Sequence, residues 1–228
     1  EINYKELFFS KFFEPVDCVL KNNNFTRFNP HHSGGRIEIL NDDFILLSTG
    51  DFKNLSLSQN DNSMFGKIIL INKKNKQYKI VSKGLRNPQG MYVDNSNSLI
   101  ISTDHGPEGG DEINLQKIND TKVANFGWSI SSYGEHYGFK SKDEKNELYK
   151  IAPLHKSHQD FGFVEPIKYF SPGIGISQVE KFSPQSNEKK YLIGSMGHNS
   201  KEGRMSLHLI ELDNSNTILK YEKKIIGG

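Results

Sequence analysis

Apolar residues recur at every second position in short runs, and this period of two predicts β-strands. The clearest runs lie at residues 37–39, 68–71, 99–101, 207–212 and 219–221. Between them come polar stretches at residues 41–43, 73–76, 95–97 and 213–216, all containing Asn or Asp or both. Such side chains bond to their own backbone in tight turns. No segment of about ten residues or more combines a helical stripe with a cap, so we expect a nearly all-β fold with almost no helix.

One segment departs from this alternation. Residues 129–164 are rich in Gly, Ser, Lys and His, and we interpret them as a long excursion between strands. Long ordered loops are often functional, but a solvated insertion is an equally open interpretation at this stage.

Charge and composition limit the partners. The formal net charge of the 228 residues is +2, and it is spread without a basic stripe, so we do not expect nucleic acid as a partner. No run of about 18 apolar residues occurs, so we expect no membrane insertion. Cys18 is the only cysteine, which excludes an intrachain disulfide. The chain starts at Glu1 and stops soon after an alternating run, and we expect an internal fragment.

The residues that carry chemistry cluster in motifs. Three of them follow one another as GLRNPQG at 84–90, DHGPEGGDEIN at 104–114 and NFGW at 125–128. Upstream lie HSGGR at 32–36 and STGD at 48–51.

These motifs have a physical meaning of their own. Arg86 and Asn87 stand between a glycine and a proline, where a rigid corner presents a forked donor and an amide to a ligand oxygen. Asp51, at the end of a predicted strand, is placed to orient the imidazole of His32, as a general base requires. Glu108, Asp111 and Glu112 make the loop after His105 rich in oxygen, which suits calcium.

In this order, the motifs resemble those of the soluble glucose/sorbosone dehydrogenase family, whose members are quinoproteins that use pyrroloquinoline quinone (PQQ) and calcium. The resemblance is strongest over residues 31–128. It implies a six-bladed β-propeller of four-stranded sheets, of which residues 1–228 would form a partial propeller of about four blades, at roughly 45 residues a blade. It also implies a periplasmic or secreted location.

The resemblance assigns roles to individual residues. His32 would be the catalytic base, with Asp51 and Arg86 beside it, and Asn87, Gln89 and His105 would line the cofactor. The carbonyls of Gly106 and Pro107 would bind the calcium ion that touches the quinone. Glu112 would bind a second calcium ion, with the carbonyl of Phe126 completing its site.

The implied reaction is oxidation of the anomeric hydroxyl of an aldose to a lactone, with electrons passing on to an external acceptor. One departure weakens the cofactor assignment, because Gly197 stands where glucose dehydrogenases have a lysine; Lys201 and Arg204 are near enough along the chain to replace it. Two alternatives stay open: a non-catalytic calcium-binding propeller that serves as a binding or interaction module, and a calcium-dependent lactonase.

A second cluster of potential ligands, His155, His158 and Asp160, lies within the excursion. It lacks a fourth ligand and has no familiar metal-site spacing, so we expect a surface loop there.

Overall fold

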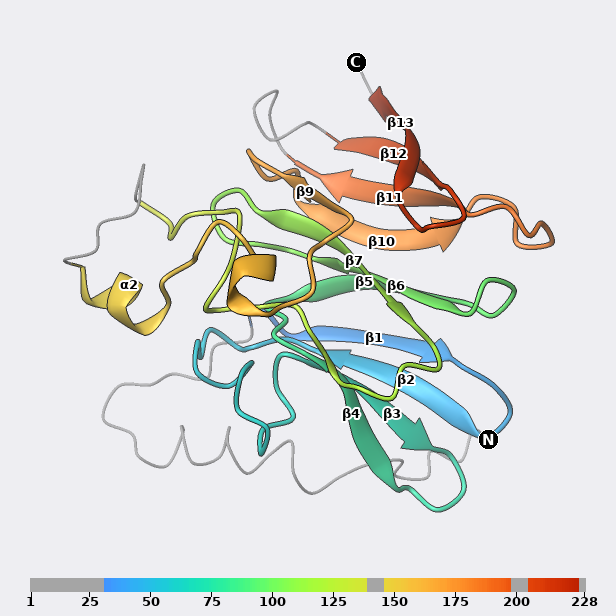
Figure 1. Ribbon diagram of the computed structural model, residues 1–228, viewed down its shortest axis with the longest axis horizontal. Helices are drawn as coiled ribbons and strands as arrows, with labels where there is room; N and C mark the ends of the chain where they lie inside the picture. Colours follow the sequence, from blue (N-terminus) through green and yellow to red (C-terminus); the bar gives the residue numbers. More distant parts are fainter. Residues whose placement is uncertain (1–30, 139–145, 198–204, 226–228) are drawn as a thin grey trace, which may run out of the picture.

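The computed structural model describes residues 31–138, 146–197 and 205–225, and these residues form three sheets (Figure 1). The first sheet contains β1 (Gly34–Ile39), β2 (Phe44–Thr49), β3 (Lys67–Asn72) and β4 (Tyr78–Lys83), with the short β8 (Ala124–Asn125) parallel to β4. The second contains β5 (Pro88–Asp94), β6 (Leu99–Asp104), β7 (Asp111–Lys117) and β9 (Lys168–Phe170). The third contains β10 (Ile176–Lys181), β11 (Lys190–Met196), β12 (Met205–Leu212) and β13 (Ile218–Ile225).

The predicted turns lie between antiparallel neighbours and are closed by the polar side chains expected there. Asn41 Oδ1 accepts hydrogen bonds from the backbone N–H groups of Asp43 and Phe44, both at 3.0 Å, between β1 and β2. Asp213 Oδ1 accepts from the Thr217 N–H at 2.9 Å between β12 and β13. The prediction of a nearly all-β hairpin fold is confirmed.

Successive sheets pack against one another as the blades of a propeller do. The first strands of the three sheets are neighbours, since β5 contacts both β1 and β10, and Figure 1 shows the sheets fanned one after another. Leu46, Met91 and Phe126 belong to the apolar core between the first and second sheets. Ile113 and Tyr191 belong to the core between the second and third. Because the second sheet has an apolar core on each side, residues at the strand ends and in the loops of neighbouring sheets can meet around a common axis.

The described residues form three sheets, and the count of about four blades for residues 1–228 stays a prediction. The connection from β7 to β9 contains the excursion, and its described part forms β8, helix α2 (Glu147–Ile151) and the 3-10 turn η1 (Gln159–Phe161). The described part of this excursion has a core of its own, in which Trp128, Tyr149 and Leu154 are buried. The excursion is therefore packed onto the blades and is not a solvated insertion. None of the described helices is long and apolar enough to cross a membrane.

A buried lysine anchors the loop between β2 and β3. Lys67 is fully buried, and its ammonium donates to the carbonyls of Leu57, Ser58 and Phe65 at 2.9, 2.8 and 2.7 Å. Burial lowers the pKa of Lys67 to about 8, so the side chain is still mostly charged at neutral pH. The loop that it secures begins at Asp51, in the middle of the candidate site.

Candidate active site

The site forms where two distant segments meet at Gly50. A Cβ atom at position 50 would lie 1.8 Å from the carbonyl oxygen of His32 and 2.9 Å from that of Arg86, so only glycine allows both chains to approach. The next residues bind the two segments, since the N–H of Asp51 donates to the Arg86 carbonyl at 2.8 Å and that of Phe52 to the His32 carbonyl at 3.2 Å. Side chains far apart in the sequence are thereby brought to one place.

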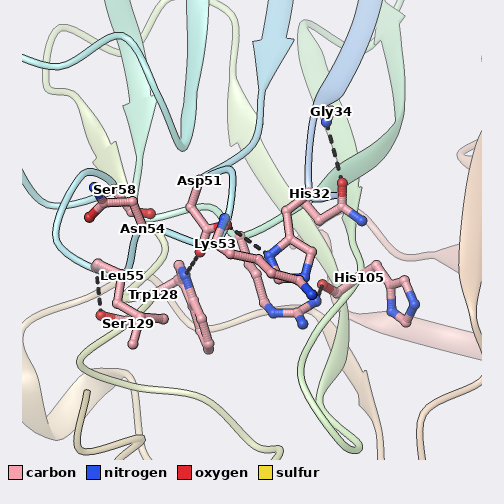
Figure 2. Close-up of polar contacts among 12 residues, drawn as sticks. His32, Gly34, Asp51, Lys53, Asn54, Leu55, Ser58, His105, Trp128 and Ser129 are labelled. Carbon is pink, nitrogen blue, oxygen red and sulfur yellow. Dashed lines mark hydrogen bonds and ion pairs between the residues drawn. The ribbon is translucent and has the colours of Figure 1, made fainter. Parts of the chain in front are cut away.

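His32 and Asp51 form a hydrogen-bonded pair. His32 Nδ1 lies 2.8 Å from Asp51 Oδ1, and the Asp51 side chain is fully buried (Figure 2). A carboxylate at Nδ1 places the proton on that nitrogen and leaves Nε2 as the acceptor. Burial lowers the pKa of His32 below its ordinary value and outweighs the opposing hydrogen bond from Asp51, while the charge of Arg86 lowers the pKa further. The lowered pKa favours the neutral imidazole, which is the form that can accept a proton.

Trp128 completes the surroundings of Asp51. Its indole Nε1 donates to Asp51 Oδ2 at 2.7 Å (Figure 2). The guanidinium of Arg86 lies 5.5 Å from the centroid of the Trp128 ring. The Lys53 N–H donates to Asp51 Oδ1 at 2.8 Å, so three donors fix this carboxylate. Sequence reasoning gave Trp128 no role, although it is the only tryptophan of the chain and closes a motif.

The corner at Arg86 and Asn87 is held by a buried acid. Asp104 accepts from the backbone N–H of Arg86 at 2.8 Å and of Asn87 at 2.6 Å. Burial raises the pKa of Asp104 to about 7, because these two bonds and the Arg86 charge compensate only partly for lost hydration. Arg86 Nη1 donates to the carbonyl of His105 at 2.6 Å, and Gln89 Nε2 donates to Asn87 Oδ1 at 2.7 Å. The predicted cofactor-lining residues are therefore linked to one another.

His105 belongs to a second histidine–aspartate pair. Its Nδ1 lies 2.6 Å from Asp111 Oδ1, which also accepts the Gly106 N–H at 2.9 Å, while Asp111 Oδ2 accepts the N–H groups of Ile174 and Ile176. Burial raises the pKa of Asp111, but the bond and charge of His105 and the backbone donors outweigh it and leave the pKa below its usual value. From the sequence, we expected Asp111 to be one of the charges that attract calcium. In the structure it instead anchors the loop that carries His105.

The predicted metal-binding residues fall into two groups. Gly106 and Pro107 line a small pocket together with Arg86, Asp104, Glu112 and Trp128. Gly106 is needed for this shape, since a Cβ there would lie 2.1 Å from the Gly110 carbonyl oxygen. The Phe126 backbone carbonyl instead contacts the ring of His158, whose Nε2 lies 3.2 Å from Glu112 Oε1. No group of three or more His, Cys, Asp or Glu side chains suited to a metal occurs in the part of the chain that the structure describes.

The prediction of a surface loop at residues 155–160 was wrong for one residue. His158 is fully buried, whereas Asp160 is exposed and His155 is half-buried with its ring stacked 3.8 Å from that of Phe161. Burial alone would lower the pKa of His158, but the charges of Glu112 and Glu165 raise it above its ordinary value. Lys201 and Arg204, the expected replacements for the missing lysine, lie outside the described residues.

Comparison with known proteins agrees with the fold and motifs. The family model described as Glucose / Sorbosone dehydrogenase matches residues 12–227. The aldose sugar dehydrogenase YliI of Escherichia coli K12 is 28% identical over 181 residues, which cover 71% of this chain and 44% of that protein. The chain therefore spans less than half the length of this curated relative.

Two solved structures have a similar fold. The apo form of the soluble aldose sugar dehydrogenase from Escherichia coli superposes with a TM-score of 0.63 at 22% identity, covering 85% of this chain and 54% of that one. The PQQ-bound aldose sugar dehydrogenase from Streptomyces coelicolor gives a TM-score of 0.57 at 19% identity, covering 84% and 48%.

The blades and the loop site between them place the chain in the class of β-propellers that includes the sugar dehydrogenases. Within that class it belongs to the glucose/sorbosone dehydrogenase family, whose model matches nearly its whole length.

Proposed function

We propose that the complete protein oxidises the anomeric hydroxyl of an aldose to a lactone, with PQQ as the hydride acceptor. The observation that carries this proposal is the His32 imidazole, held through Nδ1 by a buried carboxylate and placed next to the charge of Arg86. Such a pair is the arrangement of a general base. Family membership favours a sugar hydroxyl as the group on which it acts.

Each residue of the site has a separate role in the proposed reaction. His32 Nε2 accepts the proton of the anomeric hydroxyl, while Asp51 holds the ring and stabilises the positive charge that forms on it. Arg86 presents a fixed positive charge that favours the negative charge developing on an acceptor oxygen. When bound, PQQ supplies the carbon that takes the hydride from C1 of the sugar.

The chemistry of the described residues fits this cofactor. PQQ is an anion with carbonyl and carboxylate oxygens, and Arg86, Asn87, Gln89 and His105 form a linked set of donors at one site. The carbonyls of Gly106 and Pro107 line the same pocket as Arg86 and are hard oxygen ligands of the type that calcium prefers. We include in the proposal an external electron acceptor and a periplasmic or secreted location.

Reconstitution tests the proposal. The full-length protein is incubated with PQQ and calcium, and dye reduction is followed with a panel of aldoses, with chromatography of the lactone product. We expect aldose-dependent dye reduction that requires PQQ. PQQ binding without turnover on any aldose would favour the binding-module alternative, and lactone hydrolysis without PQQ would favour the lactonase.

A further inference from the structure

The buried side chains of Glu112 and His158 face each other next to the candidate active site. Glu112 lies on β7 and His158 just before η1, and the two residues are 5% and 0% exposed. His158 Nε2 is 3.2 Å from Glu112 Oε1, and the Phe126 backbone carbonyl contacts the same ring. Glu112 and Phe126 are the two residues that the family resemblance assigns to a second calcium ion.

The surroundings of Glu112 do not fit that ion. Calcium takes about 6–8 oxygen ligands at roughly 2.3–2.6 Å. An ion at this distance from Glu112 Oε1 on the side of the ring would overlap His158 Nε2, which is 3.2 Å away. The imidazole nitrogen is also a poor ligand for so hard a cation.

A backbone hydrogen bond and ring packing hold His158 in this place. The backbone N–H of His158 donates to Glu165 Oε1 at 2.8 Å, and the hydroxyl of Tyr133 donates to the other oxygen of Glu165 at 2.7 Å. The ring of Tyr133 stacks on that of His158 with centroids 5.3 Å apart. A Cβ at position 127 would lie 2.8 Å from His158 Nδ1, so Gly127 leaves the room that the ring occupies.

The imidazole is a polar neighbour of a buried acid. Glu112 stands directly opposite Asp104 in the pairing of β6 with β7, and both acids are buried. A buried carboxylate needs polar partners that replace its lost hydration. Asn114 Nδ2 donates to Glu112 Oε2 at 3.3 Å, and His158 Nε2 lies 3.2 Å from Glu112 Oε1.

We propose that the side chain of His158 takes the place of the second calcium ion, so that Glu112 is paired within the chain and binds no metal. The chain would then need calcium only near the Gly106 and Pro107 carbonyls. This inference concerns Glu112 alone and stands whether or not the complete protein oxidises sugars.

The amount of calcium bound per chain shows whether Glu112 is a calcium ligand or is paired with His158 instead. The full-length wild-type protein, Glu112→Gln and His158→Ala are dialysed against micromolar calcium without PQQ, and bound calcium per chain is measured by atomic absorption. We expect Glu112→Gln to bind as much calcium as wild type, while its Tm falls on the order of 5–10 °C because a buried pair is broken. Glu188→Gln is the matched control: this exposed acid pairs with Lys190 on the surface, so content and Tm stay unchanged.

Loss of one calcium equivalent in Glu112→Gln would overturn the proposal, since Glu112 would then be a ligand. His158→Ala decides the matter independently if Glu112→Gln does not fold. If His158 takes the place of a calcium ion, His158→Ala binds as much calcium per chain as wild type, or more, and this result supports the proposal. If His158 is instead part of a calcium site, His158→Ala binds less calcium than wild type, and this result contradicts the proposal.

Discussion

The Asp51→Asn substitution in the full-length protein tests how the base is oriented. It keeps the size of the side chain and removes its charge and one of its acceptor oxygens. In the structure Asp51 Oδ1 accepts from His32 Nδ1 and from the Lys53 N–H, both at 2.8 Å, and Oδ2 accepts from Trp128 Nε1 at 2.7 Å. A carboxylate satisfies three such donors, but an amide cannot, because one of its ends is itself a donor.

Either orientation of the amide impairs His32. With its oxygen toward His32, the amide NH₂ faces the indole N–H of Trp128; with its oxygen toward Trp128, the NH₂ donates to His32 Nδ1 and forces the proton onto Nε2. Each charge-assisted bond lost is worth about 1.5–3 kcal/mol, and the wrong tautomer cannot accept a proton. We therefore expect kcat to fall about 100-fold to 10,000-fold.

Dye-linked aldose oxidation gives kcat, and titration of PQQ fluorescence shows separately that the cofactor still binds. Asp61→Asn is the control, because Asp61 is 77% exposed and pairs with Lys83 at the surface. A kcat for Asp51→Asn within about threefold of the control, with PQQ bound, would refute the role of Asp51.

Three further predictions follow from the same contacts. Trp128→Phe should lower kcat about 10-fold to 100-fold, because the indole donor to Asp51 is lost. In the double variant with Asp51→Asn, kcat should fall by less than the product of the two single reductions, and a fall equal to that product would contradict the shared hydrogen bond. At low pH, kcat/KM should fall tenfold per pH unit as His32 becomes protonated. The inflection of this profile should lie below pH 6.5, because burial lowers the pKa of His32, and an inflection above pH 6.5 would count against His32 as the base. Lys67→Ala should lower the free energy of unfolding in urea by about 2–4 kcal/mol because three carbonyls lose their donor, whereas exposed Lys79→Ala should have little effect; equal effects would be inconsistent with the anchoring role.

Local patterns predicted the strands and turns well. The apolar run at residues 68–71 forms part of β3, as predicted. Asn41 closes the turn after β1, because an Asn side chain can bond to the backbone of residues that follow it closely in the sequence. The expected bond between His32 and Asp51 is also present, since one residue precedes β1 and the other follows β2, and these strands pair.

Contacts between distant segments could not be predicted in this way. The burial of His158 depends on space beside Gly127 and on Glu112, and neither leaves a signal around residue 158. Asp111 binds the N–H groups of Ile174 and Ile176 across the excursion, so its role as an anchor appears only in three dimensions.

In the proposed reaction, His32 takes a proton from a sugar hydroxyl as hydride leaves for bound PQQ. Stopped-flow absorbance measures reduction of PQQ by an aldose in a single turnover of the full-length protein, wild type against His32→Gln. The account predicts reduction in both, slowed about 100-fold to 10,000-fold in His32→Gln, with the same amount of PQQ bound. Equal rates in the two proteins, or no reduction of bound PQQ by any aldose in wild type, would contradict it.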